Sequence, residues 1–174
     1  MTNVPIRIRA FTLVELMVAI SIMAILTAII VTNLMSSRAK ARDGKRVSDI
    51  NQIQLALEFY YDRCHEYPAT LSPNANNDSC PAGITLGSFI AQIPNPPGNI
   101  ANEVYSSGYF ISPVGSLHPD NYLLHTQLES TNEVLKDGIN ESTRTAQNSP
   151  YAFASSINCY DANNFPKDYC VGPR

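Results

Sequence analysis

Residues 11–35 read FTLVELMVAISIMAILTAIIVTNLM, and this stretch decides the fold. Glu15 is its only charged residue, and the others are apolar or small apart from three threonines, one serine and one asparagine. At 1.5 Å per residue, a helix over residues 16–35 is about 30 Å long, which is the thickness of the hydrocarbon core of a bilayer. Residues 11–35, called the apolar segment below, are therefore predicted to form a helix that can span a membrane.

Charges are distributed unevenly around the apolar segment. The chain of 174 residues has a formal net charge of −3, so it lacks the excess of basic residues that non-specific nucleic-acid binding requires. Nucleic acid is therefore not an expected partner. Basic residues flank the segment, whereas most acidic residues lie beyond Asp49, as is typical of a membrane-anchored chain. The basic residues are Arg7 and Arg9 before the segment and Arg38, Lys40, Arg42, Lys45 and Arg46 after it. The second cluster is interpreted as a solvated helical face near lipid headgroups, with binding of DNA or anionic lipid as alternatives.

The helix is predicted to continue past the apolar segment. Residues 34–63 contain no proline and one glycine, and apolar side chains recur there every three or four residues. A single helix from about residue 11 to about residue 63 is expected, roughly 80 Å long, and its second half should pack against a globular domain. The packing positions are Val47, Ile50, Ile53, Leu57 and either Tyr60 or Tyr61.

Four cysteines follow the apolar segment and form two local pairs, Cys64 with Cys80 and Cys159 with Cys170. Their turn-rich surroundings and the lack of C-x-x-C spacing favour disulfides in an oxidising compartment over free thiols or a metal site. Four cysteines allow three connectivities, so the sequence leaves the pairing open. An oxidising compartment conflicts with the positive-inside rule, which would place the larger basic cluster in the cytoplasm.

Beyond Pro68 the composition changes to that of a small α+β domain. Residues 104–111 and 121–128 are predicted to be strands of an antiparallel hairpin that packs on the amphipathic half of the helix. Residues 151–157 are a third candidate strand, residues 85–93 a short helix, and residues 130–150 a connecting loop. The three histidines have neither triad-like nor metal-like spacing, so an enzyme is not expected.

Residues 9–17, RAFTLVELM, resemble the cleavage and methylation motif of type IV prepilins and type II secretion pseudopilins. Here a small residue precedes the apolar segment and Phe-Thr-Leu-x-Glu opens it, whereas the small-residue cleavage site of a secretory signal peptide follows its apolar region. The resemblance implies that a prepilin peptidase cuts between Ala10 and Phe11 and methylates the new amine of Phe11.

The similarity extends to the major pseudopilin of type II secretion over residues 33–35 (NLM), 45–50 (KRVSDI), 57–68 (LEFYYDRCHEYP) and 86–98 (LGSFIAQIPNPPG). It implies an α+β type IV pilin fold, with a long N-terminal helix packed on a small antiparallel sheet and a disulfide-closed C-terminal region. The implied organisation is a leader at 1–10, a membrane or filament-core helix at 11–35, its amphipathic continuation at 36–67 and a globular periplasmic or extracellular part at 68–174.

The resemblance also gives Glu15 a role, because an ionised carboxylate in hydrocarbon needs a partner. In the family this residue pairs with the methylated N-terminal ammonium of a neighbouring subunit; a position at the headgroup interface is the alternative. The implied function is a filament subunit that waits in the cytoplasmic membrane. Implied partners are further copies of the chain, other pilins, a prepilin peptidase, an assembly platform protein and an ATPase.

Alternatives to a secretion pseudopilin remain at this point. A type IV pilus subunit for adhesion, motility or DNA uptake has the same N-terminal pattern, and a single-pass anchor with a ligand-binding domain has the same apolar segment. Calcium is a further possibility, because Asp161, Asn163 and Asp168 place oxygen ligands inside the loop from Cys159 to Cys170. A turn-rich disulfide loop without metal is the favoured interpretation of these residues.

Overall fold

The computed structural model describes residues 11–98, 104–116, 118–131, 133–147, 149–152, 154, 157–161 and 167–173, so Ala10 and Asn163 lie outside the described residues. The chain divides into two compact units, residues 1–38 and residues 39–174. The second is called the globular unit below.

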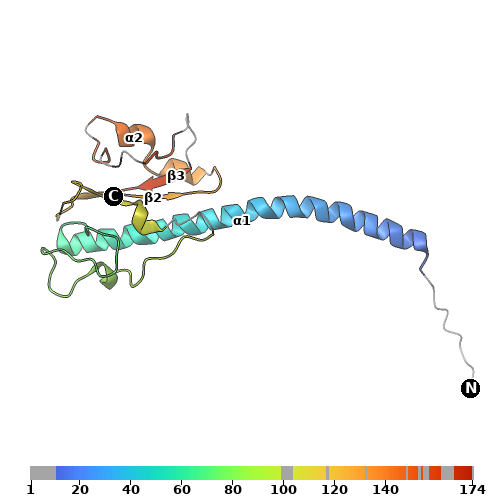
Figure 1. Ribbon diagram of the computed structural model, residues 1–174, viewed down its shortest axis with the longest axis horizontal. Coiled ribbons are helices and arrows are strands. Elements are labelled where there is room, and N and C mark those ends of the chain that lie inside the picture. The colour runs from blue at the N-terminus through green and yellow to red at the C-terminus, as the bar shows by residue number, and fades with distance from the viewer. Residues whose placement is uncertain are drawn as a thin grey trace, which may run out of the picture. The chain divides into compact units, whose positions relative to one another are not determined.

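Helix α1 runs from Leu13 to Cys64, which confirms the single long helix predicted from the sequence (Figure 1). Its first part carries the apolar segment, and residues 11–29 are all exposed; Phe11 retains 84% of its accessible surface. Only this helix is long and apolar enough to cross a membrane among the residues that the structure describes.

Within the globular unit, α1 packs through the stripe that its sequence predicts. Ile50, Ile53, Leu57 and Tyr60 are fully buried in one hydrophobic core, whereas Tyr61 is exposed, so Tyr60 completes the stripe. Full burial of a side chain of this size contributes about 1.5–3 kcal/mol of transfer free energy, which fixes this part of the helix on the sheet.

The sheet has three antiparallel strands in the order β1 (Tyr109–Ser112), β2 (Asn121–Gln127) and β3 (Asp168–Val171). Successive side chains of a strand point to opposite faces. Tyr122 and Leu124 join the core that contains the α1 stripe, whereas Leu123 joins a second core with Cys159 and Cys170. The globular unit therefore has three layers: α1, the sheet, and a C-terminal layer with the short helix α2 (Glu141–Thr145) (Figure 1).

The predicted hairpin is confirmed, but its first strand is shorter than expected. Residues Tyr105–Gly108 form the 3₁₀ helix η2, which a hydrogen bond from the Ser107 amide to the Val104 carbonyl closes. Gly108 lies so close to β2 that a Cβ atom there would be 2.3 Å from the His125 carbonyl oxygen. Strand β1 therefore begins only at Tyr109.

Three further predictions for the globular unit differ from the structure. In the candidate strand 151–157, none of the described residues 151, 152, 154 and 157 is in a strand, because the amides of Ala154 and Ile157 bond to carbonyls three residues back and form turns; β3 takes that place in the sheet. The expected loop over 130–150 contains η3 (Glu133–Asp137) and α2, whose N-cap Asn140 accepts a hydrogen bond from the Thr143 amide at 2.7 Å. The short helix expected at 85–93 is present only as η1 (Leu86–Ser88).

Candidate functional site

Thr12 and Glu15 form a reciprocal cap at the start of α1. The Glu15 amide donates to Thr12 Oγ1 at 3.2 Å, and Glu15 Oε2 accepts from the Thr12 amide at 3.2 Å and from its hydroxyl at 3.0 Å. This capping box satisfies two amides that helix geometry leaves without partners. The carboxylate of Glu15, predicted as the assembly residue, is therefore oriented toward Thr12, just before the first residue of α1.

The apolar segment exposes large hydrophobic side chains where the structure describes them. Side chains are exposed at residues 11–29, 34 and 35, with Leu13 retaining 72% and Met35 73% of its accessible surface. Soluble proteins rarely expose a continuous apolar surface of this extent, so it marks a region that lipid or other protein chains cover.

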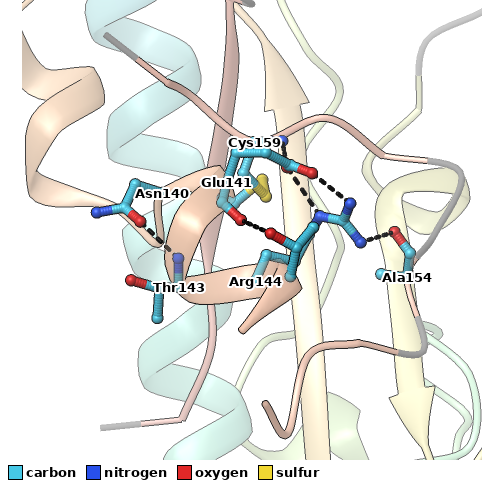
Figure 2. Close-up of a disulfide and its surroundings, with 8 residues drawn as sticks. Asn140, Glu141, Thr143, Arg144, Ala154 and Cys159 are labelled. Atoms are coloured by element: carbon cyan, nitrogen blue, oxygen red, sulfur yellow. Dashed lines mark hydrogen bonds and ion pairs between the residues drawn. A yellow bond between two sulfur atoms is a disulfide. The ribbon is translucent and has the colours of Figure 1, made fainter. Parts of the chain in front are cut away.

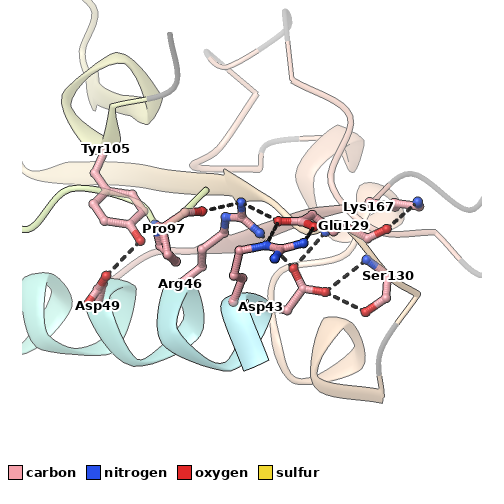
Figure 3. A network of polar contacts seen from close by, with 9 residues as sticks. Asp43, Arg46, Asp49, Pro97, Tyr105, Glu129, Ser130 and Lys167 are labelled. Atoms are coloured by element: carbon pink, nitrogen blue, oxygen red, sulfur yellow. Dashed lines mark hydrogen bonds and ion pairs between the residues drawn. The ribbon is translucent and has the colours of Figure 1, made fainter. Parts of the chain in front are cut away.

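A buried polar network lies where α1 enters the globular unit (Figure 3). Arg46 Nη1 donates to Asp43 Oδ1 at 2.9 Å, and both side chains are fully buried. Asp43 also accepts from the amides of Glu129 and Ser130, at 2.8 and 2.9 Å. Arg46 Nη2 donates to the Pro97 carbonyl at 2.7 Å and to Glu129 Oε1 at 2.9 Å. The network thus joins α1 to the segment after β2 and to the proline-rich residues 94–97.

Arg42 completes this network by pairing with Glu129. Both of its hydrogen bonds go to the carboxylate oxygens of Glu129, which is a bidentate pair. These hydrogen bonds, together with one from Arg46, lower the pKa of Glu129 to about 2. Lys45 pairs with the buried carboxylate of Asp49, which also accepts from Tyr105 at 3.0 Å. The interpretation of residues 38–46 as one solvated face is therefore wrong for the buried Arg46 and for the half-buried Arg42, whereas Lys45 is exposed.

Two tyrosine hydroxyls bind the carboxylate of Glu58, which lies further along α1. The hydroxyls of Tyr67 and Tyr122 each donate to a Glu58 carboxylate oxygen at 3.2 Å. Burial, reinforced by the charge of Glu58, raises the pKa of both phenols well above the ordinary value of 10. Burial likewise raises the pKa of Tyr109.

The globular unit contains two disulfides, Cys64 with Cys80 and Cys159 with Cys170. The second lies beside a buried arginine (Figure 2). Arg144 pairs with both carboxylate oxygens of Glu141 and donates to the Ala154 carbonyl at 2.9 Å, while Glu141 accepts from the Cys159 amide at 2.8 Å. Helix α2 is thereby tied to the C-terminal disulfide loop.

Of the three residues expected to bind calcium, the structure describes Asp161 and Asp168. Asp168 begins β3, and its carbonyl accepts from the Tyr160 amide at 3.1 Å next to Asp161, while Asn163 lies outside the described residues. Among the described residues, no group of three or more His, Cys, Asp or Glu side chains has the arrangement of a metal site. Calcium binding stays a prediction.

Several functional contacts were missed from the sequence. Thr12 was not identified as a cap, although Thr-x-x-Glu before an apolar run is the signature of a capping box. Asp43 and Arg46 are three residues apart on a helix, and this spacing permits an ion pair. No local signal connects either of them to Glu129, which lies more than eighty residues further along the chain.

The chain combines a long helix, whose apolar N-terminal segment is exposed and capped, with a globular unit that contains a small antiparallel sheet. These features define the type IV pilin class of filament subunits. Residues 6–31 match the model of the prokaryotic N-terminal methylation motif. The chain belongs to the family of the type II secretion system core protein G, as shown by the relative from Aeromonas hydrophila, which is 35% identical over 106 residues, 58% of this chain and 74% of the relative.

Two further relatives of the same name extend the comparison. The protein from Dickeya chrysanthemi is 32% identical over 108 residues, which are 59% of this chain and 71% of the relative. The protein from Escherichia coli K12 is 45% identical over 62 residues, 36% of this chain and 43% of the relative. No solved structure matches this one. The similarity to the major pseudopilin that the sequence predicted is confirmed.

Proposed function

We propose that this chain is a structural, non-catalytic subunit of a type II secretion system, anchored in the cytoplasmic membrane and polymerised from there into a filament. The exposed apolar segment, with its capping box inside the matched methylation motif, is the observation that carries this proposal. Such a surface is unstable in water, so it lies in lipid before assembly and against the same segment of other subunits afterwards. In this proposal the disulfide-closed globular unit lies outside the cytoplasm.

Processing at the N-terminus belongs to the same proposal. A prepilin peptidase cuts between Ala10 and Phe11 and methylates the amine of Phe11. Phe11 is strongly exposed and lies two residues before the first residue of α1, which keeps its amine outside the hydrogen-bonding pattern of the helix.

Glu15 is proposed to pair with the Phe11 ammonium of a neighbouring subunit. Each charge alone in apolar surroundings costs several kcal/mol, whereas a pair at hydrogen-bond distance offsets much of that cost. The pairing sets how far one subunit is displaced along the next, and it is available only when the segments lie side by side.

Two substitutions separate the charge of Glu15 from its capping contact. Glu15→Gln keeps an oxygen that can accept from Thr12 but removes the charge, and Glu15→Ala removes both. Both variants should enter the membrane as the wild type does and should give far fewer filaments in electron micrographs of sheared cells. Glu133→Gln, at an exposed glutamate of η3, is the matched control and should assemble normally. A wild-type filament yield from Glu15→Gln would contradict the pairing.

The proposed partners are further copies of the chain, other pilins, an assembly platform protein and an ATPase. A pilus that serves adhesion, motility or DNA uptake is the alternative machine. Deleting the gene distinguishes the two: loss of secreted enzymes from the medium, with twitching and transformation intact, supports the secretion role. The opposite pattern supports a pilus.

A further inference from the structure

The globular unit has a hollow with a volume of about 370 Å³ beside α1. Its lining includes residues of β3 and four residues from other parts of this unit: Gln54 of α1, Asp137 of η3, Thr143 of α2, and Tyr151. This volume lies within the range of about 300–1,000 Å³ that is typical of ligand sites in proteins. The hollow therefore has room for a group from outside the chain.

Two side chains in the wall of the hollow are held in place by the backbone of Gly172. Gln54 Nε2 donates a hydrogen bond to the Gly172 carbonyl at 2.7 Å. The ring of Tyr151 packs so closely on Gly172 that a Cβ atom there would lie 2.5 Å from the ring atom Cε1. Because the face of a tyrosine ring attracts cations, this fixed aromatic wall favours a positively charged group.

Asp137 gives the hollow a negative charge. Its side chain is exposed, and no ion pair joins it to a base in the part of the chain that the structure describes. The neighbouring Lys136 pairs with Glu133 instead, at 2.6 Å. Among the described residues that line the hollow, none is a lysine, arginine or histidine. A carboxylate beside an aromatic ring, with no cation next to it, suits the side chain of a lysine or arginine.

Lys40 is a lysine of the globular unit that can fill this role. Among the lysines and arginines that the structure describes in this unit, Lys40 alone forms neither an ion pair nor a hydrogen bond, and it is exposed. It precedes Gln54 by fourteen residues on α1, which is about 21 Å at 1.5 Å per residue. A lysine side chain cannot span that distance, so Lys40 does not reach the hollow of its own chain.

We propose that the hollow binds the Lys40 ammonium of a second copy of the chain, which pairs with Asp137 and lies against the ring of Tyr151. The contact rests on the polymerisation proposed above, which brings copies of the chain side by side. Lys40 and the hollow belong to the same compact unit. A parallel copy displaced by about 21 Å along the helix axis therefore brings them together. The contact fixes the spacing between globular units, whereas Glu15 acts between apolar segments.

Reversal of the two charges tests the pair in cells. Asp137→Lys and Lys40→Asp should each lower the yield of sheared filaments, measured by immunoblotting, about 5-fold, the factor that corresponds to an exposed ion pair of about 1 kcal/mol. The double variant with both changes should regain the wild-type yield, because the pair forms again with its charges exchanged. Asp78→Lys, the same change at an exposed aspartate outside the hollow, is the matched control and should assemble normally.

Zero-length cross-linking of wild-type filaments tests the same pair without any substitution. A carbodiimide joins an amine to a carboxylate in contact with it, so the dimer band should yield a peptide that links Lys40 to Asp137. The inference is overturned if Lys40 is linked to a different acid in that band, or if Asp137→Lys assembles as the wild type does. It is also overturned if the double variant has the wild-type circular dichroism spectrum but assembles no better than the single variants. Absence of filaments from the wild-type chain is a separate result, which would contradict the proposed function.

Discussion

Asp43 and Arg46 are in contact on α1, 2.9 Å apart between Oδ1 and Nη1, and both side chains are fully buried. A buried pair of charges is stable only when further hydrogen bonds satisfy both groups. Asp43 receives them from two amides after β2, and Arg46 gives them to the Pro97 carbonyl and to Glu129. The pair therefore holds α1 on the rest of the globular unit. It does so at the first residues of α1 that belong to this unit, just before the buried apolar stripe.

Replacing Asp43 should destabilise the globular unit strongly. Asp43→Ala leaves the Arg46 guanidinium buried without its partner, and such a loss costs about 3–5 kcal/mol. Urea unfolding of the full-length chain in detergent, followed by circular dichroism, measures the change. Asp62→Ala, at an exposed aspartate of the same helix, should change the free energy of unfolding by no more than about 0.5 kcal/mol. Equal stabilities of the two variants would refute the role of the network.

The low pKa of Glu129 predicts a specific acid sensitivity. A carboxyl group whose pKa is lower in the folded chain stabilises the fold above its unfolded value of about 4.5, and this stabilisation is lost as the pH falls toward 2. The melting temperature should therefore decrease between these pH values. Glu129→Gln should be less stable at neutral pH and should show a smaller decrease over this window. An equally steep decrease in the variant would show that other groups cause the acid sensitivity.

Buried tyrosines predict an incomplete alkaline titration. Burial raises the pKa of Tyr67, Tyr109 and Tyr122, so these phenols stay protonated in the folded chain at about pH 11, where ordinary tyrosines ionise. Their stabilisation is fully present below pH 10 and is lost as the pH rises above that value. Phenolate absorbance should account for only part of the nine tyrosines until the chain unfolds. Full amplitude near pH 11 with native circular dichroism would contradict this arrangement.

The capping box predicts fraying of α1 when Thr12 loses its hydroxyl. Loss of an N-cap side chain costs about 1 kcal/mol of helix stability, so Thr12→Val should speed amide exchange at Glu15 about 5-fold. Thr12→Ser restores the hydroxyl and should restore protection. Hydrogen exchange measured by NMR on the chain in micelles tests this, and equal protection in Thr12→Val would show that the contact does not hold the helix end.

Much of the fold follows from local patterns, whereas the contacts that fix the globular unit do not. The spacing of Ile50, Ile53 and Leu57 predicts their burial, because helical periodicity is a property of neighbouring residues. The third strand was misplaced because β3 has only four residues and its position depends on pairing with β2. Glu129 was missed because its partners on α1 become neighbours only after folding.

The N-terminus of the chain recovered from filaments tests the central claim most directly. Filaments are sheared from cells, and the chain is identified by intact-mass and N-terminal fragment mass spectrometry. The proposed function predicts that the chain in the filament fraction begins with a methylated Phe11 and lacks residues 1–10. A chain that stays in the membrane fraction with Met1 through Ala10 still attached would contradict it and would indicate an ordinary membrane anchor.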